Sequence, residues 1–520
     1  MDPGPSKKKV AQGVAWASSA QWGGQLLSFG IYTGLARLLN PNVFGLVAIA
    51  GVYIAFMQVF VQQGFGTAII QRRELEREHV DSAFWIATAT ASFFGLVSIL
   101  LEGVIARLFH EPKVAPVIGW LSLSFLIYAL SSVPMALLTR EMDFRPLAIR
   151  SLTATMAGGV VGLAMAYFGW GVWSLVGQQL VNSILGCVCL WWAVPWRPSF
   201  RISRRHLREL YGFSLNITGN DILWFFSQKS DQTLVGYGFG SLDLGPYSLA
   251  SRLVTLLHDA IIGPVQSVAL PAFSKLQSEP SRLERALHKF CELSAFLSLP
   301  MFAGIIVVAP ELVPLLFGAK WTAAVPILQV LAIYGALRVV FGFVHPLMLA
   351  KGRPGLYFLM FAIQSFLTFA GCVVAVRWSP DAIALSMVVT MAIFGLFTFV
   401  VPMRILEINV PALLKTFAFP GLSSLFMLAV VALTRSYMGR IFAPVTIMVI
   451  CVVVGVIAYV STALLIRPDL LKAIWEMVVH SLLPSKRGGP VETSLTPENY
   501  VANAKGASPT PDRDLTGRGS

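Results

Sequence analysis

The sequence predicts an all-α protein that crosses a membrane about fourteen times, and three observations lead to this fold class. Of 520 residues, 56% are hydrophobic and only 12% are charged, whereas soluble domains carry about 25% charged residues. The mean hydropathy is +0.71. The apolar segments run for about 20 residues or more, as spanning helices require, and lack the short alternation of barrel strands. So much apolar surface excludes a soluble fold and predicts a polytopic helix bundle.

Fourteen apolar segments can be marked along the chain, separated by short polar or basic breaks. They cover approximately 12–36, 44–66, 82–108, 115–138, 148–168, 172–194, 213–235, 246–270, 291–317, 325–350, 355–376, 382–404, 412–434 and 441–466. The first follows the basic run at 7–9 directly. It is too long for the apolar core of a cleavable signal, so we expect it to remain as an anchor.

The distribution of Lys and Arg predicts the orientation. With the N-terminus in the cytoplasm, the inner segments hold 26 of these residues and the outer segments hold 7. The positive-inside rule therefore predicts that both termini and the loop at 195–212 are cytoplasmic. The net charge of +13 suits the anionic inner leaflet, so it gives no reason to expect nucleic acid as a partner.

An internal repeat predicts how the helices are grouped. The stretches LARLLNPNVFGLVAIA and VGYGFGSLDLGPYSLA lie 200 residues apart, and each runs through a polar break to a glycine, Gly45 or Gly245. Two further stretches, beginning at Leu108 and Leu316, repeat two prolines at offsets of 210 and 212 residues. Apolar sequences can look alike by chance, but matching order across several landmarks favours duplication. The repeat predicts two parallel six-helix lobes around a central cavity.

The domain organisation follows from the repeat. Residues 1–212 are expected to form the N-terminal lobe with a basic cytoplasmic linker, and 213–405 the C-terminal lobe. Residues 406–466 add two spans outside the repeat. The segment 467–520 is expected to be a cytoplasmic tail, largely disordered because it is rich in Pro, Ser, Thr and Gly.

Three cations lie inside predicted spans: Lys229, Arg252 and Arg338. A charge at the centre of a spanning helix costs about 2.5–3.5 kcal/mol on insertion scales, so such residues are candidates for function. Lys229 and Arg252 also lie on stripes of polar residues at helical spacing. We expect the three to hold an anionic substrate in a wet cavity between the lobes.

Three acids accompany the cations in the same part of the sequence: Asp221, Asp231 and Asp259. Helix neighbours face each other at spacings of three or four. Lys229 and Asp231 are two apart, and Arg252 and Asp259 are seven apart, so neither pair is well placed within its own helix. The acids either couple transport to an H⁺ or Na⁺ gradient or neutralise the cations between helices, and both readings stay open.

The first copy of the internal repeat lacks these charged residues. At the 200-residue offset, Lys229 falls on Phe29 and Arg252 on Val52. The polar residues that it offers instead are glutamines, namely Gln21, Gln25, Gln58, Gln62 and Gln63. No motif for a cofactor or metal is present, since the cysteines and histidines are scattered. The loop at 279–290 is amphipathic, and we expect an interfacial helix there.

Several stretches resemble a known family. They are LARLLNPNVFGLVAIA, AIIQRRELEREHVDSAFW, VPMALLTREMDFRPLAIRS, GWGVWSLVGQQL, DLGPYSLASRLV, ALPAFSKLQSEPSRL and GAKWTAAVPILQVLA. Together they resemble bacterial polysaccharide flippases of the Wzx type, in the multidrug/oligosaccharidyl-lipid/polysaccharide exporter superfamily. The resemblance covers roughly residues 10 to 470 and rests on the order of many short landmarks.

The resemblance implies a protein of the bacterial inner membrane that alternates between inward and outward openings. Its substrate would be an oligosaccharide linked to undecaprenyl pyrophosphate, flipped for exopolysaccharide, capsule or O-antigen synthesis. The partners implied are membrane lipids, a polysaccharide polymerase and chain-length machinery. Members commonly have a cationic cavity, which Lys229, Arg252 and Arg338 would supply here.

Two other functions remain as alternatives. A cation-coupled multidrug exporter would share the fold, but organic cations would favour acids in the cavity without three buried bases. A membrane-embedded glycosyltransferase or polymerase would need acid/base or metal-binding groups on a substantial loop. The internal loops are about 20 residues or shorter, and none carries a cluster of Asp, Glu and His, so we expect no enzymatic activity.

Overall fold

The computed structural model describes residues 7–62, 65–72, 75–200, 204–439 and 441–468, and helices are the only regular secondary structure in this part of the chain. The helices are α1 (Lys7–Leu38), α2 (Pro41–Gln62), α3 (Phe65–Gln71), α4 (Arg77–Leu108), α5 (Val114–Arg140), α6 (Phe144–Tyr167), α7 (Val172–Ala193), α8 (Arg204–Lys275), α9 (Pro280–Phe317), the 3₁₀ turn η1 (Ala319–Trp321), α10 (Ala324–Phe341), α11 (Val344–Ala350), α12 (Pro354–Ala375), α13 (Pro380–Ile405), α14 (Val410–Met438) and α15 (Pro444–Ile466). The predicted disorder of the tail concerns residues that lie almost wholly outside these ranges.

The helices make this a multi-pass membrane protein. Within the described residues, twelve helical segments are long and apolar enough to cross a bilayer. That set counts α8 once and joins α10 to α11, and it does not include α1. Adding α1 and separating the two legs of α8 gives the fourteen spans expected from the sequence. The all-α fold class is therefore confirmed.

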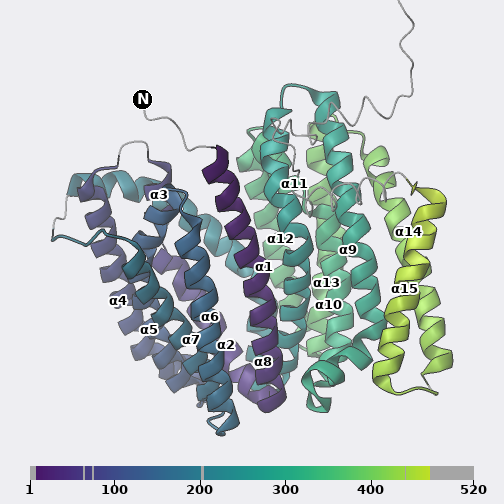
Figure 1. Ribbon diagram of the computed structural model, residues 1–520, viewed down its shortest axis with the longest axis horizontal. Helices are drawn as coiled ribbons and strands as arrows, with labels where there is room; N and C mark the ends of the chain where they lie inside the picture. The colour runs from purple at the N-terminus through teal and green to yellow at the C-terminus, as the bar shows by residue number, and fades with distance from the viewer. Residues whose placement is uncertain (1–6, 63–64, 73–74, 201–203, 440, 469–520) are drawn as a thin grey trace, which may run out of the picture.

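The helices form two lobes side by side (Figure 1). In the first lobe α1 packs on α6, α6 on α7, and α5 on α2, α4 and α7. In the second lobe α10 packs on α8, α9 and α13, while α12 packs on α8 and α13. The pair α14 and α15 contacts the second lobe through α9, at the edge of the molecule away from the first lobe (Figure 1). The lobe boundaries placed at 212 and 405 stay predictions.

The helix α8 is a hairpin rather than one rod. Gly240 has φ of 76° and ψ of −168°, which breaks the helix into legs at 204–239 and 241–275. A positive φ of this kind favours glycine. The break between α1 and α2 lies at residues 39–40, 200 residues earlier. Both copies of the repeat thus open with two long helices joined by a minimal turn.

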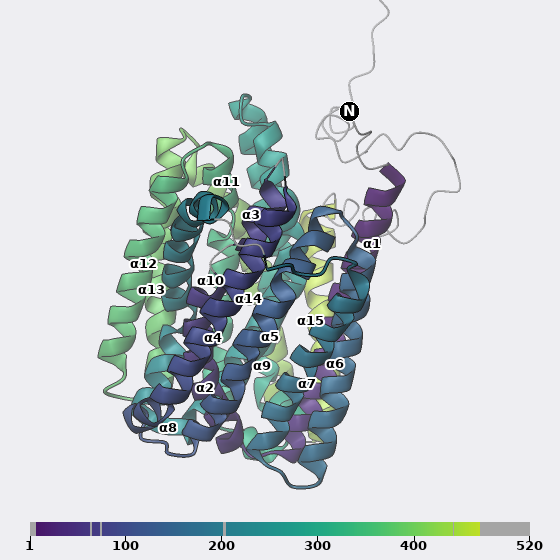
Figure 2. The ribbon, with the colours of Figure 1, turned by 90° about the vertical axis from the view of Figure 1, so that its left-hand side faces the viewer.

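The two opening turns meet each other at one end of the bundle. A Cβ atom at Gly45 would overlap the carbonyl of Ser241, and one at Gly245 would overlap the carbonyl of Pro41. The contact is reciprocal, because the same two positions of each copy face each other with the roles exchanged. This end, which carries residues 37–45, 108–114, 236–245 and 316–324, is called the hairpin end below; in Figure 2 it lies at the bottom, away from the N-terminus.

A second reciprocal exchange closes the hairpin end. The loop between α4 and α5 reaches the second copy, where the Ser241 backbone N–H donates to Glu111 Oε1 over 3.0 Å. The loop between α9 and α10 reaches the first copy, where Trp321 Nε1 donates to the Ala36 carbonyl over 2.8 Å. Each lobe therefore caps the opening turn of the other.

The opposite end is called the linker end, because the chain passes there from the first lobe towards the second. Trp85 Nε1 of α4 donates to the Ser199 carbonyl over 3.0 Å, and the Phe200 ring stacks on Trp85 at a centroid distance of 4.5 Å. The Ser199 hydroxyl donates to the buried carboxylate of Asp81. The start of the linker is thereby attached to the first lobe.

The expectation of an interfacial helix at 279–290 is wrong. These residues are the first turns of α9, which runs on without a break to Phe317. Leu283 is 2% exposed and Leu287 is fully buried, both in a cluster with Phe343 and Met403. The apolar face that predicted contact with lipid is covered by the protein's own helices.

Candidate functional site

The two legs of α8 hold the polar side chains of the second lobe in place. Lys229 Nζ donates to Gln232 Oε1 over 3.0 Å, and Gln232 Nε2 donates to Ser251 Oγ over 3.1 Å. This chain of contacts runs from the first leg to the second. It fixes the Lys229 ammonium while leaving two of its three N–H bonds for another acceptor.

Arg252 lines a cavity of about 250 Å³ between the lobes, called the Arg252 cavity. The wall opposite Arg252 belongs to the first lobe and is made of neutral polar groups. Its lining residues are Gln21, Gly24, Gln25 and Ser28 of α1, Ser151 and Thr155 of α6, and Arg252 and Leu256 of α8. Arg252 is thus an exposed guanidinium facing amides and hydroxyls.

Lys229 lines a second cavity, of about 440 Å³, called the Lys229 cavity. Its walls are α2 and the first leg of α8. The lining residues are Ala55, Gln58, Val59 and Gln62 on the first side, and Asp221, Trp224, Phe225 and Lys229 on the second. Trp224 lines this cavity and is 57% exposed.

Arg338 lies near the end of α10, with its guanidinium 5.9 Å from the centroid of the Tyr334 ring. It interacts electrostatically with His258 of α8, which is 7% exposed. Arg338 does not line either of the two cavities described above. The structure therefore brings Lys229 and Arg252 to the interface between the lobes in separate cavities and places Arg338 deeper in the second lobe.

No ion pair neutralises these cations in the part of the chain that the structure describes. Ion pairs in this part of the chain involve Arg282, Arg435, Arg467 and His258, and none of these includes Lys229, Arg252 or Arg338. Pairing between helices was the structural alternative to a role in binding. In this conformation the three positive charges stand without a carboxylate at contact distance.

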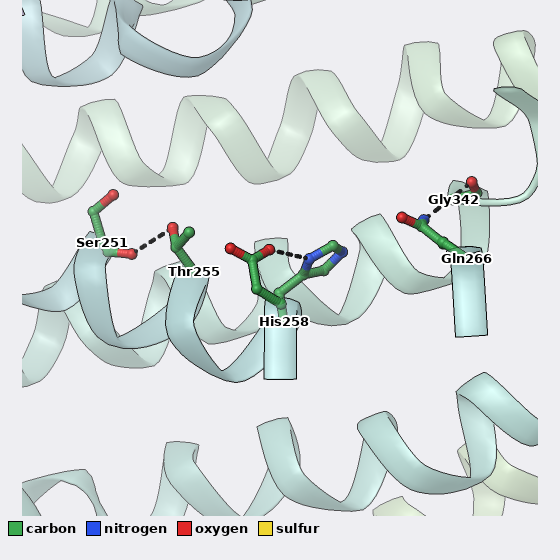
Figure 3. Close-up of polar contacts among 6 residues, drawn as sticks. Ser251, Thr255, His258, Gln266 and Gly342 are labelled. Atoms are coloured by element: carbon green, nitrogen blue, oxygen red, sulfur yellow. Dashed lines mark hydrogen bonds and ion pairs between the residues drawn. The ribbon is translucent and has the colours of Figure 1, made fainter. Parts of the chain in front are cut away.

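The three acids have different surroundings. Asp231 is 4% exposed, and its Oδ2 accepts a hydrogen bond of 3.0 Å from Tyr247, which ties the two legs of α8 together. The Asp259 side chain is 55% exposed and lies 3.2 Å from His258 Nδ1 (Figure 3). Asp221 lines the Lys229 cavity. Asp221 and Asp259 are therefore accessible, while Asp231 is enclosed.

Figure 3 shows that polar groups continue along the second leg of α8 beyond Arg252. Thr255 Oγ1 donates to the Ser251 carbonyl over 2.9 Å, and Gln266 Nε2 donates to the Gly342 carbonyl over 3.3 Å. Gly342 lies at the break between α10 and α11, so Gln266 satisfies a carbonyl that the helix break leaves free.

Sequence reasoning missed the residues that face the cations. Gln21 and Gln25 face Arg252, and Gln58 and Gln62 face Lys229, whereas the pattern had identified these glutamines only as counterparts in the repeat. Their spacing of four residues on apolar helices was a usable signal, since it places both amides of a pair on one face. Trp224 gave no signal among 13 tryptophans.

The family follows from the sequence. Residues 35–326 match the description "Polysaccharide biosynthesis protein". The chain belongs to that family. The matched region runs from the opening turn of the first copy to α10, so it includes the Lys229 cavity, Arg252, the reciprocal glycines and the linker between the lobes, whereas the α1 residues of the Arg252 cavity precede it.

Curated relatives of this family member extend the match. The chain is 28% identical over 333 residues, 64% of its length and 67% of the relative's, to the "Succinoglycan biosynthesis transport protein ExoT" of Rhizobium meliloti (strain 1021). It is 25% identical over 372 residues, 71% of its length and 75% of the relative's, to the "Lipopolysaccharide biosynthesis protein WzxC" of Escherichia coli (strain K12). The resemblance to Wzx-type proteins is thus confirmed.

The fold of the family member is shared with a solved transporter. The structure titled "Lipid II flippase MurJ, inward closed conformation" superposes with a TM-score of 0.73 at 15% identity, over 88% of this chain and all of that one. Identity this low carries information about the fold alone. The two-lobe transporter architecture expected from the internal repeat is confirmed.

Proposed function

We propose that this protein moves an oligosaccharide linked to undecaprenyl pyrophosphate across the membrane for polysaccharide biosynthesis. The observation that carries the proposal is the pair of cavities between the lobes, each lined by a cation without an ion-pair partner on one wall and by amides on the other. The relatives named as succinoglycan transport and lipopolysaccharide biosynthesis proteins support it.

The chemistry of the substrate matches those walls. A pyrophosphate linked to sugars cannot enter hydrocarbon unaided, because charges and hydroxyls without partners are costly there. Arg252 can grip a phosphate with two parallel N–H bonds, and Lys229 offers a point charge. Arg338, close to the buried His258, would join them in a conformation where the cavities merge. A bound head group favours that state only if the state binds it more tightly.

The proposed orientation places the linker end in the cytoplasm and the hairpin end outside, in the bacterial inner membrane. The 26-to-7 distribution of Lys and Arg supports it. Because the reciprocal contacts occupy the hairpin end, the described conformation is closed towards the outside. A substrate made in the cytoplasm would then load from the linker end.

Coupling to an ion gradient is part of the proposal. Asp221 and Asp259 are accessible acids within spans, which gives H⁺ or Na⁺ a place to bind as the lobes move. Asp231 has a structural contact with Tyr247, so it is the least suited of the three. A polysaccharide polymerase and chain-length machinery would be the partners that receive the product.

The alternatives fit the cavities less well. A multidrug exporter for organic cations would have to accommodate Lys229 and Arg252 on its binding walls. A glycosyltransferase or polymerase would need a catalytic cluster, and the described residues contain no group of three or more His, Cys, Asp or Glu that could hold a metal ion. The relatives named as transport proteins also favour a protein that is not an enzyme.

Reconstitution tests the proposal. The protein is placed in proteoliposomes with a fluorescent undecaprenyl-pyrophosphoryl disaccharide, and the lipid that reaches the other leaflet is measured by its accessibility to a soluble glycosidase. We expect transfer that depends on the protein. Transfer equal to that of empty liposomes, from protein that is folded and inserted, would refute the function.

A further inference from the structure

The two cavities between the lobes differ in charge. Among the described residues that line the Arg252 cavity, Arg252 is the only charged one, and the other polar groups belong to the neutral Gln21, Gln25, Ser28, Ser151 and Thr155. In the Lys229 cavity the lining includes both Lys229 and Asp221. The lining of the Arg252 cavity therefore carries a net positive charge, and the lining of the Lys229 cavity is neutral overall.

A phosphate would favour the first cavity. Guanidinium, amide and hydroxyl groups all donate hydrogen bonds, and an arginine forms two-pronged contacts with phosphate oxygens. The carboxylate of Asp221 in the second cavity would repel the same group. The negative charge of Asp221 on the same wall thus weakens the case for a phosphate at Lys229.

A sugar would favour the second cavity. Sugar hydroxyls both donate and accept hydrogen bonds, and so do the side-chain amides of Gln58 and Gln62, while Asp221 accepts and Lys229 donates. Trp224, 57% exposed, offers a flat apolar face to the C–H face of a sugar ring. The volume of about 440 Å³ falls in the range of roughly 300–1,000 Å³ that small-molecule sites occupy.

We propose that the Lys229 cavity is a sugar-recognition site, formed by Gln58, Gln62, Trp224, Asp221 and Lys229, and that it is distinct from a phosphate site at Arg252. This inference rests on the proposed function and deepens it. It assigns the two ends of one head group to two cavities, and it moves Lys229 from phosphate contact to sugar contact. It also makes residues of the first lobe responsible for choosing the glycan.

The experiment compares two probes that differ only in the sugar. Binding to the full-length protein in lipid nanodiscs is measured for undecaprenyl pyrophosphate and for the same lipid bearing one glucose, galactose or N-acetylglucosamine. The readout is the ratio of the two dissociation constants, which reports the sugar alone. In the wild type, we expect at least one sugar to tighten binding about tenfold, as a pair of net hydrogen bonds would.

Variants then identify the residues responsible for the tighter binding of the sugar-bearing probe. Gln62→Leu and Trp224→Ala should each reduce the ratio by about threefold to tenfold, and Arg252→Gln should weaken both probes while leaving the ratio in place. The matched controls are Gln277→Leu and Trp192→Ala, since both side chains are exposed and line neither cavity. These controls should not change the ratio.

Two results would overturn the sugar site. One is a wild-type protein that binds bare undecaprenyl pyrophosphate but gains nothing from any of the three sugars. The other is a Gln62→Leu or Trp224→Ala variant that weakens the binding of both probes equally. In either case the proposed function stands, because the carrier still binds. Failure of the wild type to bind or move any undecaprenyl pyrophosphate would instead remove the function and the sugar site together.

Discussion

Gly45 and Gly245 make the same contact in opposite directions. Gly45 lies against the backbone carbonyl of Ser241, and Gly245 lies against that of Pro41. Each glycine thus faces the residue four positions before the other, and the pairs are related by the 200-residue offset of the repeat. A contact between backbones leaves no room for a side chain, so the hairpin end closes only with glycine at both positions.

Replacing Gly45 with alanine should therefore destabilise the described conformation. The new methyl group would meet a carbonyl that cannot rotate away, and overpacking of this kind costs about 1–3 kcal/mol. The matched control is Gly51→Ala on the same helix, where no neighbouring atom lies within 4 Å of the added Cβ. Thermal unfolding in detergent should show a lower midpoint for Gly45→Ala than for the control. Equal midpoints would contradict the contact.

The orientation can be tested with single cysteines in a background without the five native cysteines. Ser241 would be a poor position, because its side chain is 2% exposed; Leu242 beside it is 65% exposed. In intact cells, we expect an impermeant thiol reagent to label Leu242→Cys and to spare Ser278→Cys at the linker end. Ser278→Cys should react after lysis. The reverse pattern would invert the topology.

Loss of the Arg252 charge should reduce polysaccharide export without reducing the amount of protein in the membrane. No ion pair holds Arg252 among the described residues, so Arg252→Gln leaves no buried acid behind. A charge-assisted contact of about 1.5–3 kcal/mol predicts a tenfold or greater loss of export. Arg252→Lys should recover only part of it, because the two-pronged contact is lost.

The control for that experiment is Arg107→Gln, since Arg107 is exposed near the hairpin end and its guanidinium donates to the Gly103 carbonyl of its own helix. Quantitative blots of the membrane fraction accompany each export measurement. Normal export from a well-expressed Arg252→Gln protein would remove Arg252 from the binding site.

Coupling to an ion gradient predicts a specific role for Asp259. Its carboxylate is accessible beside His258, so Asp259→Asn should abolish the response of transport to an imposed H⁺ or Na⁺ gradient. Exchange of labelled substrate without a gradient should continue. Asp243→Asn at the hairpin end, also exposed, is the control. Wild-type transport that ignores both gradients would refute coupling.

The pair α14 and α15 should be held to α9 by an ion pair of measurable strength. Arg435 Nε lies 2.7 Å from Glu311 Oε1, and the two side chains are 35% and 15% exposed. A double-mutant cycle with Glu311→Gln and Arg435→Gln should give a coupling energy of about 1–3 kcal/mol. The pair Glu279–Arg282, which is 3.0 Å apart and almost half exposed, should give less than about 0.5 kcal/mol. Equal coupling energies for the two pairs would mean that burial does not strengthen the ion pair between Glu311 and Arg435.

The fold could be predicted from the sequence because the hydropathy pattern and the internal repeat both follow directly from it. The length of the apolar segments predicted the membrane spans. The polar break and glycine that recur around Gly45 and Gly245 predicted the grouping of the spans into two lobes. The segment at 279–290 was misread, since an amphipathic pattern shows that one face is covered and does not show by what. Leu287 is covered by neighbouring helices, and only tertiary structure could reveal that.

Only part of the candidate functional site could be predicted from the sequence. Charge inside a span identifies Lys229 and Arg252 without a structure, because the cost of burial restricts such residues. Their separation into two cavities depends on how α8 turns at Gly240 and how the lobes meet. The glutamines opposite them were neutral, so no rule based on charge could have selected Gln25 or Gln58.

The reciprocal contact at Gly45 and Gly245 has the geometry of an interface between two identical subunits, where a surface pairs with its own copy. In such a homodimer every side chain would occur on both sides of the axis. A cation would then occur at both symmetry-related positions, and an amide facing it would be duplicated as well. Joining the two halves in one polypeptide removes that restriction. The fused chain keeps the symmetrical closure of the hairpin end while reserving Lys229 and Arg252 for one side and Gln58 and Gln25 for the other.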